Sequence, residues 1–129
     1  MADAQKHSIL VVDDDSMMRE MLKLILLSEE YRIAGEAANG HDAVMQCVSL
    51  KPDLVLLDIN MPKMDGLQAL EEIRKANPTT KVLMVSADAT MDKVKEAIQK
   101  GAVGFIVKPL NPASVLDKVG MCFKGKKKG

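Results

Sequence analysis

The sequence predicts a single α/β domain built on a parallel sheet, and two features lead to that prediction. Short apolar runs alternate with segments whose apolar residues recur every three or four positions, about five times along the 129 residues. The run 54–57 reads Leu-Val-Leu-Leu, as expected for a strand covered on both faces. Right-handed crossovers between such strands would give a doubly wound, five-stranded parallel sheet with helices on both sides, a (βα)5 fold.

The expected elements follow from this alternation. Strands are expected at 9–12, 31–37, 54–57, 81–85 and 103–107. Helices are expected at 17–27, 41–50, from about 67 to the Asn77-Pro78 stop, at 88–100 and at 112–123. Asp15 or Ser16 could cap the first helix. The helical spacing places Val48 and Ile98 on the inner faces of the second and fourth helices.

Composition favours a soluble globular domain and argues against nucleic-acid binding. Hydrophobic residues make up 47% and charged residues 28%, and 18 basic residues balance 18 acidic ones. Four lysines lie in 124–129, so the rest of the chain has 14 basic against 18 acidic residues. We interpret this basic tail as a solvated end. No basic face with recognition features is evident.

The cysteines and the hydropathy pattern complete these limits. Cys47 and Cys122 form no CxxC pair, so two free, buried thiols are expected. No apolar stretch has the length of a signal peptide or a membrane span. We therefore expect a cytoplasmic protein without membrane insertion.

Polar residues follow four of the expected strands, and they suggest chemistry. Asp13, Asp14 and Asp15 follow the first strand, and Asp58, Ser86 and Lys108 follow the third, fourth and fifth. Open α/β sheets bind ligands at the carboxyl ends of their strands. Two or three carboxylates suit Mg²⁺, and Lys108 would offset their mutual repulsion. The alternative is that the aspartates at 13–15 only cap a helix.

A carboxylate beside Mg²⁺ and a lysine could attack phosphorus and form an aspartyl-phosphate. The lysine, the metal and the hydroxyl of Ser86 would then stabilise charge on the transferred group.

Four motifs in this order resemble the receiver domain of two-component response regulators: VVDDDS, LLDINMPKMDG, VSADA and GFIVKP. The resemblance covers about 8–123, and a stand-alone chemotaxis-type regulator is a close likeness. It implies the flavodoxin-like strand order 2-1-3-4-5 for one receiver domain spanning 1–129.

The resemblance also implies roles for individual residues. Asp58 would be the phosphoacceptor, and Lys108 would pair with it and then with its phosphoryl group. Asp13, Asp14, Asp58 and the backbone carbonyl of Asn60 would bind Mg²⁺, for which Mn²⁺ may substitute. Ser86 and Phe105 occupy the family's switch positions, and Lys108-Pro109 occupies the position of its usual cis peptide. Asp15 is interpreted as a surface or capping residue.

The partners implied by the resemblance are proteins. A sensor histidine kinase would donate the phosphoryl group, and a downstream target would bind the face formed by 88–123. The chain would be a monomer that could dimerise on phosphorylation. It would be a signalling protein that catalyses only its own phosphorylation and dephosphorylation.

Other functions remain open at this point. A stand-alone phosphorelay receiver in another pathway and a phosphorylation-independent scaffold both fit the fold. Phosphatases with an aspartate nucleophile place a second carboxylate two residues later, where this chain has Asn60. A nucleotide-binding module would need a glycine-rich phosphate loop, and neither GxGxxG nor GxxxxGK[ST] occurs.

Overall fold

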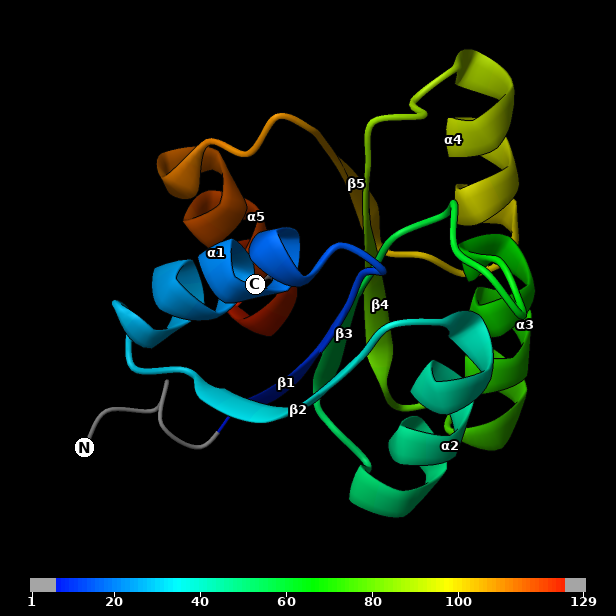
Figure 1. The fold of residues 1–129 in the computed structure, drawn as a ribbon, viewed down its shortest axis with the longest axis horizontal. Helices are drawn as coiled ribbons and strands as arrows, with labels where there is room; N and C mark the ends of the chain where they lie inside the picture. The colour runs from blue at the N-terminus through cyan, green and yellow to red at the C-terminus, as the bar shows by residue number, and fades with distance from the viewer. Residues whose placement is uncertain (1–6, 125–129) are drawn as a thin grey trace.

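The computed structural model describes residues 7–124, which form alternating strands and helices (Figure 1). The strands are β1 (Ser8–Val12), β2 (Arg32–Ala37), β3 (Leu54–Leu57), β4 (Lys81–Ser86) and β5 (Gly104–Val107). The helices are α1 (Ser16–Leu27), α2 (Gly40–Leu50), α3 (Gly66–Ala76), α4 (Met91–Gln99) and α5 (Pro112–Lys124). Residues 125–129, with most of the expected basic tail, lie outside the described part.

The five strands form one parallel sheet in the order β2-β1-β3-β4-β5, which confirms the expected fold class and strand order. The chain first adds β2 on one side of β1 and then crosses to add β3 on the other. Between β1 and β3 the winding direction therefore reverses, and open α/β sheets bind ligands at the carboxyl ends of the strands beside such a reversal.

Helices cover both faces of the sheet, with α1 and α5 on one side and α2, α3 and α4 on the other (Figure 1). Alternate residues of β1 point to opposite faces. Ile9 and Val11 pack with α1 and α5, whereas Leu10 and Val12 pack with α2 and α3. Since β3 is buried on both faces, all four of its side chains belong to the core.

The predicted start of α4 was wrong by three residues. Its first helical residue is Met91, and the side chain of Thr90 caps it by accepting a hydrogen bond from the Lys93 amide. The Asp88 amide instead donates to the hydroxyl of Ser86, 3.1 Å away, which holds this segment outside the helix. Apolar spacing alone placed the start of α4 too early, because the capping residue Thr90 determines where the helix begins.

Two side chains assigned to the interior are exposed. Val48 is 51% and Ile98 is 48% solvent-exposed. On α4 only Ala97 is fully buried, and on α2 the buried side is Gly40, Ala43 and Cys47. Each of these helices buries only a narrow stripe of side chains. Val48 and Ile98 each follow a buried residue, Cys47 and Ala97, and so lie about 100° round the helix from it, outside the contact.

The two cysteines are free, as predicted, but only one is buried. Cys47 lies on the buried side of α2, whereas Cys122 is half-buried near the end of α5. Within residues 7–124, every helix is too short or too polar to cross a lipid bilayer.

Candidate functional site

The site lies where β1 and β3 end side by side at the reversal of the sheet. The Asp13 amide donates to the Ala37 carbonyl, and the Asp58 amide donates to the Val12 carbonyl, each at 3.1 Å. These bonds extend the sheet by one residue, so both aspartates are fixed by backbone pairing rather than by a free loop. Both carboxylates are buried, with Asp13 1% and Asp58 5% exposed.

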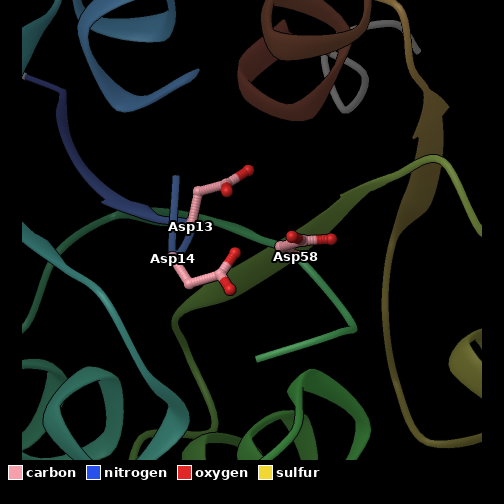
Figure 2. Close-up of side chains that lie close together, drawn as sticks. All are labelled: Asp13, Asp14 and Asp58. Carbon is pink, nitrogen blue, oxygen red and sulfur yellow. The ribbon is translucent and has the colours of Figure 1, made fainter. Parts of the chain in front are cut away.

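Asp14 completes an acidic cluster with Asp13 and Asp58. One ligand atom from each of the three residues lies within 4.8 Å of the others. Figure 2 shows the three side chains close together, two from the segment after β1 and one from the end of β3. Asp14 is exposed, so the cluster is open to solvent on that side. The spacing of these oxygens is suited to a divalent cation.

Asp15 does not join the cluster, as predicted. Its carboxylate accepts a hydrogen bond from the Met17 amide at 2.9 Å and caps α1. The Asp15 amide in turn donates to the carboxylate of Asp13. Helix capping therefore accounts for one aspartate of the three in a row and leaves the other two unexplained.

Lys108 directly follows β5 and reaches the acidic cluster from there. The Lys108-Pro109 bond is cis, as the resemblance implied. Its Nζ lies 2.8 Å from Oδ2 of Asp13 and 3.4 Å from Oδ2 of Asp58. The predicted contact with Asp58 is present, but the shorter one is to Asp13. Lys108 thus neutralises part of the charge of two buried carboxylates at once.

These neighbours shift two ionisation equilibria. Burial raises the pKa of Asp58, and the negative charge of Asp13 raises it further, while Lys108 opposes both effects. Burial would lower the pKa of Lys108, but its contacts with Asp13 and Asp58 outweigh this and hold the pKa above the ordinary value. The cluster therefore holds more negative charge than one lysine balances.

The three other residues with predicted roles, Ser86, Phe105 and Asn60, differ in how deeply they are buried. Ser86 ends β4 with a buried side chain, and its carbonyl accepts the Lys108 amide at 3.1 Å. The hydroxyl of Ser86 acts to lower the pKa of Asp58, against the larger effect of burial. Phe105 lies on β5, partly buried against the core on the α3 and α4 side. Asn60 is exposed in the loop after β3.

Gly66 is needed at the site, although it was not among the predicted site residues. A β-carbon at Gly66 would lie 1.8 Å from the Asp58 carbonyl oxygen. The Gly66 amide donates to the Ile59 carbonyl at 2.7 Å, which closes the loop after β3. Any side chain here would push α3 away from the backbone of Asp58. No local sequence pattern predicts such a contact.

Arg19 and Glu36 also support the site, although no sequence pattern predicts that they do. The Arg19 guanidinium donates to the Asp13 carbonyl and to the Glu36 carboxylate, each at 2.7 Å. Arg19 comes from α1 and Glu36 from β2, so their pairing depends on the tertiary fold. Arg19, which Glu36 holds in place, thus fixes the backbone of Asp13.

The fold and this site define a known family. Residues 9–120 match the family model for the response regulator receiver domain, and the chain belongs to that family.

Relatives of similar length have similar sequences. The chain is 45% identical to the chemotaxis protein CheY of Thermotoga maritima, over 90% of this chain and 97% of that protein. It is 43% identical to the CheY of Bacillus subtilis, over 88% of this chain and 94% of the relative. Among solved structures it resembles a CheY in complex with CheX, BeF3 and magnesium from Borrelia burgdorferi. That match has a TM-score of 0.89 and 39% identity, covering 91% of this chain and 89% of the other.

Proposed function

We propose that this protein is a response regulator of the chemotaxis type, which accepts a phosphoryl group on Asp58. The observation that carries the proposal is a buried carboxylate with two acidic neighbours and a lysine, in a receiver domain. Relatives named for chemotaxis align with the chain over almost their whole length, and this favours the same pathway over another phosphorelay.

The acidic cluster fits a magnesium ion. Three carboxylates with ligand atoms within 4.8 Å of one another repel each other, and burial of two of them strengthens that repulsion. Asp13, Asp14, Asp58 and the backbone carbonyl of Asn60 would hold Mg²⁺, with water filling the remaining positions; Mn²⁺ is a candidate substitute. When bound, the ion supplies positive charge that stabilises the transferring phosphoryl group.

Asp58 acts as the nucleophile in this proposal. One of its carboxylate oxygens bonds to phosphorus while the bond from phosphorus to a kinase histidine nitrogen breaks, and the electron pair leaves with that nitrogen. The Ile59 amide, 2.8 Å from Oδ1, orients the carboxylate. Lys108 then pairs with the new phosphoryl oxygens, and the Ser86 hydroxyl donates a hydrogen bond to one of them. Hydrolysis of the same phosphoryl group returns Asp58 to its starting state.

The output in this proposal is a change of one surface. Ser86 moves toward the phosphoryl group, Phe105 turns into the space it leaves, and the face formed by 88–123 rearranges. That face already exposes large apolar side chains, which suit a protein partner: Met91, Ile98, Val103, Val107 and Met121. A sensor histidine kinase supplies the phosphoryl group, and a target protein, or a second phosphorylated copy, binds this face.

Intact-mass measurement after incubation with acetyl phosphate tests the proposal. With Mg²⁺ we expect a gain of one phosphoryl group that hydroxylamine removes, and no gain in Asp58→Asn. The exposed Asp117→Asn variant is the matched control and should be labelled as wild type is. Labelling of Asp58→Asn under the same conditions would refute Asp58 as the acceptor.

A second variant separates phosphorylation from output. In Lys108→Ala the nucleophile and the acidic cluster remain, but the cation that should sense the phosphoryl group is absent. We expect labelling by acetyl phosphate without the change in amide exchange over 88–123 that we expect for phosphorylated wild type. A normal surface change in phosphorylated Lys108→Ala would contradict the role given to the lysine.

A further inference from the structure

A cavity lies at the end of the sheet opposite the acidic cluster, between β4, β5 and α5. Its volume is about 420 Å³, within the usual range for pockets that bind small molecules. Lys81 begins β4 and Gly104 begins β5, so the cavity opens at the amino ends of the strands, whereas Asp58 lies beyond the carboxyl end of β3. It is thus spatially separate from the proposed phosphorylation site.

The walls of the cavity are apolar and its rim is cationic. Leu83, Val103, Met121 and Cys122 supply the walls, and Lys81 and Lys118 carry the polar groups of the lining. No acidic side chain is among the lining residues. Gly104, also in the lining, has no side chain to fill the space between β5 and α5.

The two lysines keep their charge uncompensated in the described part of the chain. Within residues 7–123, the lysine ion pairs involve Lys23, Lys100 and Lys108. Lys81 donates one hydrogen bond to the Cys122 carbonyl, which orients its ammonium group at the cavity and leaves two N–H donors free. A ligand with an apolar chain and one negative charge could therefore pack its chain against the apolar lining and pair its charge with the two lysines.

We propose that this cavity binds a small monoanionic amphiphile, such as a medium-chain carboxylate, with its chain against Leu83 and Met121 and its head group at Lys81 and Lys118. The complementarity of charge selects this ligand over a neutral apolar one, which would leave the two ammonium groups unpaired. Because five of the seven lining residues lie within 88–123, bound ligand would cover part of the surface formed by that segment.

Cys122 provides a direct measure of occupancy. It is half-buried in the cavity wall, while Cys47 is fully buried in the core, so a neutral alkylating reagent on the folded protein should modify Cys122 alone. We would follow alkylation by iodoacetamide with intact mass and peptide mapping, with decanoate or 1-decanol added. At about ten times its Kd, decanoate should slow Cys122 alkylation about tenfold, since only the empty cavity reacts.

Charge reversal tests the recognition of the anion. In Lys118→Glu the walls stay intact and the residue is exposed, so the fold should persist, but decanoate should bind at least about tenfold more weakly. Lys75→Glu, an exposed lysine on α3, is the matched control and should keep full protection. Protection is taken as the ratio of rates with and without ligand for each variant, so any change in intrinsic thiol reactivity cancels.

Four results would overturn the proposal. These are no protection by decanoate, equal protection by 1-decanol, full protection in Lys118→Glu, or protection that rises with protein concentration alone together with a dimer in sedimentation. The last would mean that a second copy of the chain covers the cavity. Labelling of Asp58 by acetyl phosphate is independent of every one of these results.

Discussion

The ammonium group of Lys108 lies closer to Asp13 than to Asp58, the proposed phosphoacceptor, at 2.8 Å against 3.4 Å. A metal ion that binds Asp13 must therefore compete with the lysine for the same carboxylate. Lys108 thus stabilises the metal-free cluster and at the same time opposes cation binding.

Replacing Lys108 by Ala should therefore strengthen Mg²⁺ binding. Loss of one positive charge next to the site favours the ion, and we expect about a tenfold lower Kd. Titration calorimetry on the unphosphorylated protein measures this, and Lys75→Ala, far from the cluster on α3, controls for net charge. A Kd that is unchanged or higher would mean that Lys108 does not compete with the metal.

Replacing Asp58 by Asn should stabilise the metal-free protein. Because the pKa of Asp58 is raised by the fold, the folded state binds its proton more tightly than the unfolded state does. The cost of the charged form is absent below the ordinary pKa of 3.8 and grows as pH rises through the higher folded value. Near neutral pH we expect a gain on the order of 1 kcal/mol, about 4 °C in Tm for a domain of this size.

Thermal unfolding with and without Mg²⁺ tests this reasoning. Saturating Mg²⁺ should raise the Tm of wild type, because the ion binds only the folded state, and should raise that of Asp58→Asn less. The exposed Asp117→Asn should behave as wild type does. If Asp58→Asn lowered the Tm without metal, the carboxylate would be making stabilising contacts that outweigh its burial.

Gly66→Ala should disrupt the site and the fold together. The added β-carbon would lie 1.8 Å from the Asp58 carbonyl oxygen, so α3 or β3 must move. We expect a loss of about 3 kcal/mol or more, in the range of severe overpacking. Gly120→Ala is the matched control: nothing lies within 4 Å of its β-carbon, and alanine in helix α5 should stabilise by about 0.5–1 kcal/mol. Urea unfolding of both variants decides the point.

The strand order and the meeting of Asp13, Asp58 and Lys108 could be predicted because they follow from local pattern and a few rules. Apolar runs that end in polar residues mark strands with functional ends, and crossover handedness with family likeness gives their order. The same patterns misplaced the start of α4 and the exposure of Val48 and Ile98. Apolar spacing reports a helical face but not how wide a stripe the sheet covers, or which hydroxyl caps the helix.

Contacts between distant segments could not be predicted. The close approach of Gly66 to Asp58 and the bond from Arg19 to Asp13 depend on the angle at which helices meet the sheet. The two contacts of Lys108 differ by less than 1 Å, with 2.8 Å to Asp13 against 3.4 Å to Asp58. A sequence cannot rank two distances that are so similar. The cavity at β4, β5 and α5 has no sequence signal, since its two lysines, Lys81 and Lys118, lie 37 positions apart in the chain.

Glu36 should make the free energy of unfolding depend on pH. It pairs with Arg19, which in turn bonds to the backbone of Asp13. Hydrogen bonds from Lys23 and then Arg19 lower the pKa of its carboxylate below the ordinary 4.5. The folded state therefore releases this proton more readily than the unfolded state, and the gain is present above the ordinary pKa and lost as pH falls through the lower folded value. Glu36→Gln should be less stable than wild type near neutral pH, by the modest amount usual for partly exposed ion pairs, and equal to it in strong acid.

Urea unfolding of Glu36→Gln and wild type at several pH values measures this difference. Glu72→Gln, an exposed glutamate on α3, is the control, and it should track wild type at every pH. Since Arg19 also donates to the Asp13 carbonyl, freeing it from Glu36 should loosen the backbone beside the acidic cluster and weaken Mg²⁺ binding as well. A pH-independent difference would show that Glu36 acts through packing rather than through its charge.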